Sequence, residues 1–526
     1  MFIDEEDLAT AASADWDVIV VGAGAVGLVL AVSLSRANQR VLLLESGAAD
    51  HTDANDLNDI QVTGRPHLGA LSGRARTVGG TTTLWGGQLT QFAAYDFDAR
   101  EIMADCPWPL HYADIERHYA DVAAMLDLDL SRLSDQSIPI RSMSSGIGCL
   151  SGCEIFFTRW LREPNLARFF SADLAARSTL SVAPRCHATS VLCGSDDAKI
   201  TGIRAVAAGG GEFVFRARDV VLACGTIEIS RLLLLTARKS RNLAWAQNAN
   251  IGRYFQDHLD LVIGRIELKN KRAFADIFEN VVIGGNKYQP KIRMQTTALR
   301  KLGCLNIACT VRFDSAIAED LHMLKQFFKS LLRGSRVDKP WRSIRRMAAL
   351  GPVWFPLIWR YLRHRRILAL SDRGISVIAH CEQRPLKESR ISLDPRKIDR
   401  FGDPIPQLHW VVDEVLQMKS LHLFADQLAG FLESQCDATL IARAAILSGD
   451  SSIMAEATDS YHQCGGARMA LQAADGVVDS NCKVFGTRNL FVAGAAVFPS
   501  SSFANPTFTA MAIAYRLRNH LLEMRQ

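Results

Sequence analysis

A stretch near the N-terminus, Val18-Ile-Val-Val-Gly22-Ala-Gly24-Ala-Val-Gly27, decides the fold class of this chain. Its first four residues are apolar and β-branched, which is typical of a buried parallel strand. The apolar run over residues 28–34 predicts a helix directly after the glycines. In such a unit the first glycine makes the turn, the second lets the backbone approach a pyrophosphate, and the third lets helix and strand pack. The stretch therefore predicts a phosphate at the N-terminus of the helix.

A second apolar run, residues 41–44, predicts the neighbouring strand and ends in Glu45. Glu45 follows Gly27 by eighteen residues, where a carboxylate accepts hydrogen bonds from the ribose hydroxyls of an adenosine. A GxGxxG pattern alone is a weak signal, but this one follows a predicted strand, begins a predicted helix and is accompanied by Glu45 at the expected distance. We therefore expect a Rossmann-like dinucleotide-binding domain in a chain of the α/β class.

The C-terminal region carries a second pattern, Phe491-Val-Ala-Gly494-Ala-Ala-Val-Phe-Pro-Ser-Ser-Ser-Phe-Ala-Asn505-Pro506-Thr507. It predicts a buried strand, a tight loop and a helix that Asn505 caps and Pro506 begins. The helix N-terminus would present free N–H groups and partial positive charge. These would suit the anionic pyrimidine end of a reduced flavin. An Asn-Pro pair by itself is more often only a helix start.

Composition agrees with a large enzyme. The 526 residues are 48% hydrophobic and 22% charged, so the chain can bury more than one core and two intertwined domains are expected. The acidic N-terminus lacks the basic region of a secretory signal, and the predicted strand and helix account for the apolar run from Val18 to Leu34. Of the twelve cysteines only Cys149 and Cys153 are close together, which favours reduced thiols in a cytoplasmic protein and no metal site.

Five further motifs occur in a fixed order along the chain. They include a Gly-Gly-Thr-Thr-Thr-Leu-Trp-Gly-Gly loop and a His-Gln-Cys-Gly-Gly segment, and they cover residues 78–87, 220–233, 252–258, 382–393 and 462–469. Together with the two ends of the chain they resemble the glucose-methanol-choline (GMC) family of FAD-dependent oxidoreductases. The resemblance covers roughly residues 15–265 and 370–522. Within the family the motifs are most similar to bacterial sugar dehydrogenases and pyranose oxidase.

The resemblance implies roles for particular residues. His462 matches the catalytic histidine, which takes the hydroxyl proton of an alcohol while the carbinol hydride passes to flavin N5. Asn505 matches the second member of the pair and would orient the alcohol oxygen. Gly466 stands where relatives often have threonine, which would loosen the loop behind His462. The residues expected at the cofactor are Gly22, Gly24, Gly27, Glu45, Gly80, Thr81, Thr82, Trp85, Gly86, Gly225, Gly494 and Thr507.

One departure from the family pattern indicates how FAD is attached. Pyranose oxidase carries, just before the tryptophan of the glycine loop, a histidine that is bonded covalently to the flavin. Leu84 occupies that place here and cannot form such a bond. FAD is therefore expected to be bound noncovalently. We interpret His258 and residues 382–390, which also match family positions, as packing and sheet structure.

The family pattern implies a discontinuous arrangement. The FAD-binding domain is expected over residues 15–110, 180–265 and 450–526, with a connecting segment over 111–179. A substrate domain over 266–449 is expected to contain an antiparallel sheet covered by helices, because residues 262–268 and 375–381 read as strands. We expect this sheet to face the flavin.

A basic segment, residues 323–368, interrupts the substrate domain. It holds twelve Lys and Arg against the single Asp338, a formal charge of +11 in a chain whose total is +5. Leu324, Phe327, Phe328, Leu331 and Leu332 fall on one face of a predicted helix. The segment indicates an interfacial helix pair on an anionic membrane, so the protein is expected to be peripheral there. An acidic partner and a merely solvated face are the alternatives, and no nucleic-acid module accompanies the charge.

The sequence therefore predicts FAD-dependent oxidation of a CH–OH group of a sugar, polyol or glycosylated lipid to a carbonyl, with His462 as the base. Two alternatives stay open: a lyase whose flavin is idle, and a flavin-binding subunit of a membrane-bound dehydrogenase complex. The sequence does not distinguish oxygen, a quinone or a cytochrome as the electron acceptor.

Overall fold

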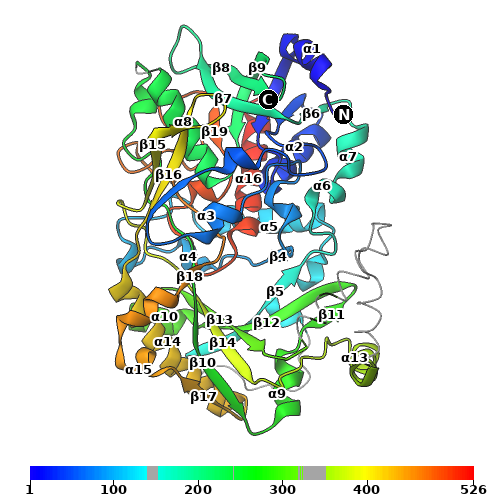
Figure 1. Ribbon diagram of the computed structural model, residues 1–526, viewed down its shortest axis with the longest axis vertical. Helices are drawn as coiled ribbons and strands as arrows, with labels where there is room; N and C mark the ends of the chain where they lie inside the picture. The colour runs from blue at the N-terminus through cyan, green and yellow to red at the C-terminus, as the bar shows by residue number, and fades with distance from the viewer. Residues whose placement is uncertain (139–151, 241, 318–319, 321–322, 324–350, 526) are drawn as a thin grey trace.

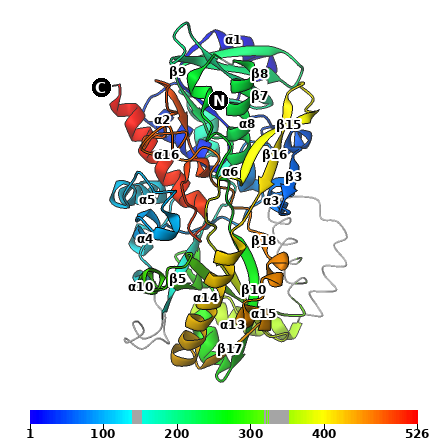
Figure 2. The same ribbon diagram turned by 90° about the vertical axis from the view of Figure 1, so that its left-hand side faces the viewer.

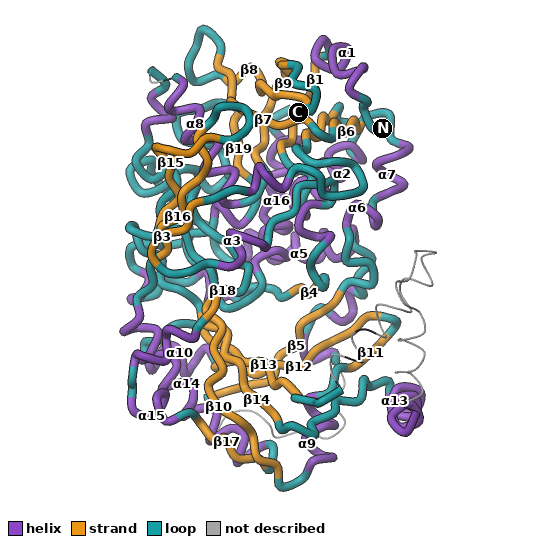
Figure 3. Tube along the Cα trace, in the orientation of Figure 1, coloured by secondary structure: helices purple, strands orange, loops and turns teal. Residues whose placement is uncertain are grey.

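The computed structural model describes residues 1–138, 152–240, 242–317, 320, 323 and 351–525. The strands gather in an upper and a lower group, with helices and loops between and around them (Figure 1, Figure 3). Each group has its own large hydrophobic cluster, so the expectation of more than one core is confirmed.

The upper group is a seven-stranded sheet. Its parallel part has the order β6 (Leu180–Ala183), β2 (Val41–Leu44), β1 (Asp15–Val21) and β9 (Glu212–Leu222), with β19 (Leu490–Val492) parallel to the end of β9. An antiparallel pair, β8 (Ile200–Ala207) and β7 (Cys186–Cys193), extends the sheet beyond β9. The first predicted strand is β1 and the second is β2, so the Rossmann-like prediction is confirmed.

Three helices begin near the ends of these strands. They are α2 (Ala25–Arg36), α8 (Thr226–Lys239) and α16 (Pro506–Glu523). Helix α2 follows the glycine turn after β1, α8 follows β9, and α16 packs against α2. Because the upper strands are parallel, their carboxyl ends and these helix N-termini meet at one edge of the sheet, where ligands bind in open α/β sheets.

The lower group is a nine-stranded sheet that is antiparallel throughout. Its order is β17 (Ala438–Ala442), β10 (Leu259–Leu268), β14 (Ile375–Cys381), β13 (Ile307–Phe313), β12 (Asn286–Met294), β5 (Cys153–Trp160) and β4 (Gln88–Leu89), with β11 (Val281–Ile283) and β18 (Thr458–Asp459) at its sides. Helix α14 (Glu414–Gln435) packs against one face through Phe424 and Leu428 (Figure 2). The two predicted strands, residues 262–268 and 375–381, lie in β10 and β14, and the predicted antiparallel sheet is confirmed, since these two strands pair with each other in it.

The strands of the lower sheet cross the predicted domain limits. The expected boundary at residue 265 falls inside β10, since the strand continues with the same alternation of side chains to Leu268. Strands β4 and β5 come from the segments 15–110 and 111–179 but pair in the lower sheet. Long-range strand pairing, which composition does not indicate, therefore places these residues beside strands from the segment 266–449.

A third, three-stranded sheet lies at the side of the upper group. It contains β15 (Arg390–Ile398), β16 (Pro404–Trp410) and β3 (Gln61–Gly64). The remaining described helices are α1 (Leu8–Ser13), α3 (Leu68–Ser72), α4 (Ala94–Phe97), α5 (Ala113–Met125), α6 (Leu166–Phe169), α7 (Ser171–Ala176), α9 (Lys271–Phe278), α10 (Thr296–Leu302), α13 (Gly351–His364) and α15 (Ala444–Ser448). The eleven described cysteines are all free thiols.

The basic segment is only partly described. The predicted helix around Leu324 to Arg333 lies outside the described residues, whereas α13 covers the second half of the segment. Helix α13 lies at the margin of the lower group, near β11 (Figure 1). Among the described helices, none combines the length and the hydropathy that a bilayer crossing requires.

Candidate active site

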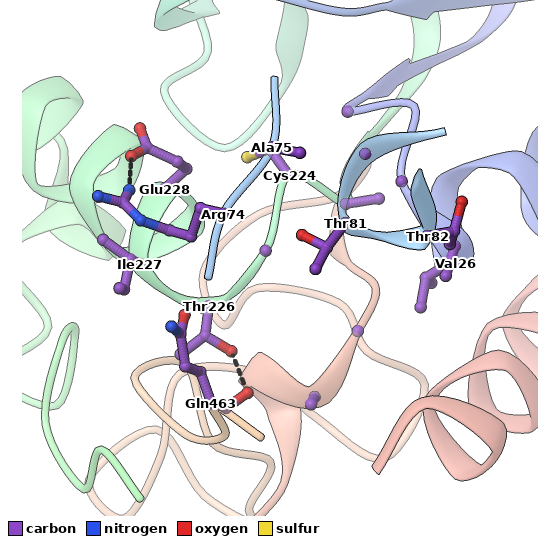
Figure 4. A pocket seen from close by; sticks show the side chains of 18 of the residues that line it. Val26, Arg74, Ala75, Thr81, Thr82, Cys224, Thr226, Ile227, Glu228 and Gln463 are labelled. Carbon is purple, nitrogen blue, oxygen red and sulfur yellow. Dashed lines mark hydrogen bonds and ion pairs between the residues drawn. The ribbon is translucent and has the colours of Figure 1, made fainter. Parts of the chain in front are cut away.

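A cavity of about 470 Å³ lies where the two groups of strands meet. Trp160 and Gln88 of the lower sheet line it together with the glycine turns of the upper sheet, which Figure 4 shows from close by. All but one of the residues predicted at the cofactor line this single cavity: Gly22, Gly24, Glu45, Gly80, Thr81, Thr82, Trp85, Gly86, Gly225, Gly494 and Thr507. His462 and Asn505 line it as well.

The exception, Gly27, has a different role. A Cβ atom at Gly27 would lie 1.9 Å from the carbonyl oxygen of Gly22, so helix α2 can approach the turn only with glycine there. In contrast, a Cβ at Gly24, Gly225 or Gly494 would meet nothing within 4 Å. These three glycines line the cavity and leave their backbone open to it. The arrangement fits an elongated dinucleotide that passes close to the main chain.

Glu45 lies buried beside the first glycine turn. Its carboxylate accepts hydrogen bonds from the backbone N–H of Ala23 at 3.0 Å and of Gly47 at 2.9 Å. Burial raises the pKa of Glu45, and these two hydrogen bonds act in the opposite direction. A carboxylate has about four acceptor positions, so it retains capacity for ribose hydroxyls in the cavity.

Buried charges that the sequence did not reveal form another wall of the cavity. Arg74 Nη1 lies 2.8 Å from Glu228 Oε1, as Figure 4 shows, and Arg76 Nη2 lies 2.9 Å from the same oxygen. Burial would raise the pKa of Glu228, but Arg76, Arg231 and Arg74 together lower it to about 2. Glu228 lies in a predicted motif, but its partners Arg74 and Arg76 are more than 150 positions away. The sequence around these two arginines does not indicate that they pair with Glu228.

The hydroxyl of Thr82 stabilises the conformation of the glycine loop, residues 79–87, through two hydrogen bonds. Thr82 Oγ1 donates to the carbonyl of Gly79 at 2.6 Å and accepts from the N–H of Leu166 at 3.1 Å. Thr81 is exposed to the cavity side. Leu84 is 60% exposed and does not line the cavity.

His462 and Asn505 meet at one end of the cavity. Asn505 Nδ2 lies 2.9 Å from His462 Nε2, and Thr90 Oγ1 donates to Asn505 Oδ1 at 3.3 Å. With the amide in this orientation, its N–H donates to Nε2, which is therefore unprotonated. The predicted cap is wrong: Asn505 occupies the N-cap position of α16, but its side chain makes no capping hydrogen bond because it reaches His462 instead.

The other ring nitrogen of His462 points away from Asn505. Nδ1 lies 2.9 Å from Ser460 Oγ and 3.1 Å from His258 Nδ1. Burial, followed by the nearby His258, lowers the pKa of His462 to about 3. The imidazole is therefore neutral at pH 7, with its proton on Nδ1 and an acceptor at Nε2. His258, interpreted above as packing, thus contacts the catalytic candidate directly.

Asp257 holds the backbone of this cluster. Its Oδ1 accepts from the N–H groups of His258 at 2.7 Å, of His462 at 2.9 Å and of Ser460 at 3.3 Å. Asp257 is fully buried, and its other oxygen lies 3.2 Å from His67 Nε2. One carboxylate therefore fixes both histidines, and only the fold brings residues 257 and 462 together.

His67, Asp257 and Asp459 form a buried group whose ligand atoms lie within 4.8 Å of one another. Most of its polar atoms already form hydrogen bonds within the protein, and the two that do not, His67 Nε2 and Asp257 Oδ2, lie 3.2 Å from each other. Asp459 accepts from the N–H groups of Leu68 and Gly69, and His67 Nδ1 accepts from that of Ala70. We assign this group a structural role at the start of α3.

Glu382 supports the loop that precedes Asn505. It is fully buried, forms a two-point ion pair with Arg100 at 2.7 and 2.8 Å, and accepts from the N–H of Ser502 at 3.1 Å. This contact agrees with the structural interpretation of residues 382–390. It also positions the loop whose end carries Asn505.

Glycine turns at the carboxyl ends of parallel strands that line one cavity are typical of proteins that bind dinucleotides. Two family models, both described as GMC oxidoreductase, match the chain over residues 164–260 and 385–514. Both regions carry the sequence pattern of this family, so the predicted resemblance to GMC oxidoreductases is confirmed.

Individual relatives are more distant. A 6'''-hydroxyparomomycin C oxidase from Streptomyces lividus is 31% identical over 20% of this chain and 21% of its own length. A paromamine 6'-oxidase from Streptomyces fradiae is 31% identical over 20% and 22%. The dehydrogenase str4 from Strobilurus tenacellus is 21% identical over 95% of this chain and 93% of its own length. The chain thus matches about a fifth of the two oxidases and nearly all of the dehydrogenase.

Proposed function

We propose that this protein oxidises a CH–OH group of a small molecule to a carbonyl with bound FAD. The observation that carries the proposal is the 2.9 Å contact between His462 Nε2 and Asn505 Nδ2 at the end of a glycine-lined cavity. An unprotonated imidazole nitrogen and an amide donor on one wall form a suitable site for an alcohol oxygen. The matches to the GMC oxidoreductase models support FAD as the cofactor.

The residues divide the work as follows. FAD, when bound, supplies the hydride acceptor at N5. His462 Nε2 accepts the proton of the alcohol hydroxyl, and the amide of Asn505 orients the alcohol oxygen. Loss of this proton from oxygen and of a hydride from carbon removes two electrons from CH–OH and leaves C=O. Asp257 keeps the His462 backbone in place throughout, since its carboxylate accepts the N–H of His462.

Noncovalent attachment of FAD is supported by Leu84, which has no group that could bond to the flavin. Retention would depend on contacts of the kinds seen along the cavity. These are the open backbone at Gly24, Gly225 and Gly494 and the acceptor oxygens of Glu45.

A sugar, polyol or glycosylated lipid is the proposed substrate class. The names of two relatives, both oxidases of paromomycin-type compounds, support a glycosidic substrate. Addition of alcohols to the purified protein without air tests the proposal, because a redox enzyme bleaches its flavin absorbance. A lyase of the same fold would turn over without bleaching, and a docking subunit would do neither.

We further propose that α13 docks the enzyme on an anionic membrane. Phe355, Ile358, Trp359 and Leu362 are 73%, 53%, 56% and 64% exposed. Their spacing of i, i+3, i+4 and i+7 puts them on one face of the helix. Residues 351–368 contain four Arg and no acidic residue, which complements anionic lipid rather than a neutral surface.

The helix is held to the body by a few specific contacts. Arg360 Nε donates to Glu279 Oε2 at 2.7 Å, and the same guanidinium pairs with Asp276 of α9. This Arg is therefore occupied, whereas the apolar face points outward. A membrane location would bring the cavity to a lipid-linked substrate or a membrane quinone.

A further inference from the structure

The face of the lower sheet that is turned away from α14 carries a group of polar side chains. Gln289 and Lys291 share this face of β12, since side chains two apart on a strand point the same way. His380 of β14 links polar side chains of the two strands beside it. Its Nδ1 lies 2.8 Å from Asp260 Oδ1 on β10, and its Nε2 lies 2.6 Å from Thr310 Oγ1 on β13. Gln289, His380, Asp260 and Thr310 are half-buried, so the face around Lys291 is partly open.

This polar face adjoins the cavity. Gln88, which lines the cavity, lies with its Nε2 3.2 Å from Gln289 Oε1. Phe156, opposite Lys291 in the register, packs against Phe503 with ring centroids 5.3 Å apart. Phe503 precedes Asn505 by two residues. The polar face therefore lies next to the loop that carries the alcohol-orienting amide.

Lys291 is the unusual member of the group. Its side chain is buried, with 8% exposed, and within the described part of the chain no hydrogen bond or ion pair involves its ammonium, although Nζ itself is not fully enclosed. Burial lowers the pKa of Lys291 to about 8, while Asp260 and Cys309 act in the opposite direction. Asp260 lies near enough to favour the charged form of Lys291, but its carboxylate already forms a hydrogen bond with His380. A buried ammonium without a partner is costly unless a ligand supplies the acceptor.

Building on the proposed function, we infer that Lys291 binds an anionic group of the substrate, a carboxylate or a phosphate, while hydroxyls of the same molecule meet Gln289 and Thr310. The substrate class narrows accordingly to acidic or phosphorylated sugars and polyols. A charge-assisted hydrogen bond from a buried ammonium gives both affinity and orientation. Lys291 is then a specificity-determining residue rather than a catalytic one.

The experiment compares binding of matched ligands to the FAD-loaded protein without turnover, by the change in flavin absorbance and by thermal shift. Glucose, glucuronate and glucose 6-phosphate form the set, so the two anions distinguish a carboxylate from a phosphate. The variants are Lys291→Met, Lys291→Arg and, as a matched control, Arg293→Gln. Arg293 lies on the same strand and face but is already paired with Glu154 at 2.7 Å.

We expect the parent to bind at least one anion about 10- to 100-fold more tightly than glucose, from the usual worth of a hydrogen bond to a charged group. Lys291→Met should abolish this preference, while Lys291→Arg and Arg293→Gln should keep it. Lys291→Met should also melt at a higher temperature than the parent, because it removes an unpartnered charge. A parent without anion preference, or a preference that survives Lys291→Met, would overturn the inference. Because binding is measured without turnover, failure of flavin reduction would count against the proposed function alone.

Discussion

The proposed chemistry depends on a single nitrogen atom, Nε2 of His462. This nitrogen carries no proton because the ring proton lies on Nδ1, beside Ser460 and His258, and Asp257 holds the backbone in place. With its pKa lowered to about 3, chiefly by burial, the imidazole stays neutral throughout the physiological range. Acid inactivation between pH 5 and pH 7 is therefore not expected to arise from this residue.

Replacement of the base is the first test at the residue scale. His462→Ala should slow flavin reduction by about 10² to 10⁴, the usual worth of a positioned general base, while the FAD stays bound. Asn505→Ala should cost less, since it removes orientation but leaves the base. Rapid-mixing measurements without air give both rates. A His462→Ala protein that reduces its flavin at the parent rate would remove this histidine from the mechanism.

Glu228 gives a prediction about acid stability. Three guanidiniums lower its pKa from 4.5 to about 2, so its charge stabilises the native state above pH 4.5 and this contribution disappears as the pH falls toward 2. The shift corresponds to at most about 3 kcal/mol. Glu228→Gln should be clearly less stable than the parent at pH 7, and the difference should shrink between pH 5 and pH 3. Melting curves of both proteins between pH 5 and pH 3 measure this difference in stability. A difference that does not change with pH would contradict a pKa of about 2 for Glu228.

At the scale of elements, the turn between β1 and α2 and the end of β2 form the end of the cavity at which we propose that the nucleotide binds. Glu45→Ala should weaken FAD retention, because the carboxylate fixes the Ala23 and Gly47 N–H groups and would accept hydrogen bonds from the ribose. Gel filtration followed by the flavin-to-protein absorbance ratio measures this. Acid or heat precipitation of the parent should release free FAD. Flavin that stays with the precipitate would reveal a covalent bond at another site.

Helix α13 provides a second test at this scale. Attraction to an anionic leaflet is worth about 1 kcal/mol per nearby Lys or Arg, so half of the twelve in residues 323–368 would contribute roughly 6 kcal/mol. The protein should sediment with anionic vesicles, less at high salt, and poorly with neutral ones. Replacing Phe355, Trp359 and Leu362 with Ser should reduce sedimentation and leave the reduction of a soluble substrate unchanged.

Two exposed apolar residues elsewhere serve as controls for the vesicle assay. Val415 and Leu471 are 83% and 79% exposed, and their replacement by Ser should not affect sedimentation. Equal binding to neutral and anionic vesicles, or to neither, would favour a partner-docking or solvated surface. Substitution of Lys325, Lys329, Arg333, Arg345 and Arg346 by Gln tests the charge separately, because none of the five lies in a cofactor motif.

At the scale of the whole molecule, local patterns and long-range contacts differ in what the sequence reveals. The strand, glycines and helix around Gly24, and Glu45 at the end of β2, are local and could be predicted from spacing. His462 and Asn505 could be named only by family resemblance. Asp257 and His258 are not predicted as site residues, because no pattern near them in the sequence indicates that they contact His462.

The missed and wrong details share a physical cause. Lys291 belongs to an ordinary strand pattern, and only the three-dimensional structure shows that it is buried opposite Phe156. Asn505 has the composition of a helix cap, yet a histidine 43 residues earlier in the sequence takes its side chain. Strands β4 and β5 also depart from their sequence neighbours, because they pair in the lower sheet, and no local pattern indicates that pairing.

The central claim is that a CH–OH group gives its hydride and its proton at the His462 end of the cavity. The most direct measurement is an anaerobic titration of the FAD-loaded protein with sugars and polyols, including acidic ones, that counts carbonyl product and reduced flavin together. We predict one carbonyl formed for each flavin bleached, in the parent and not at a comparable rate in His462→Ala. Product that accumulates while the flavin stays oxidised would contradict the claim and indicate a lyase, and neither product nor bleaching with any alcohol would contradict it as well.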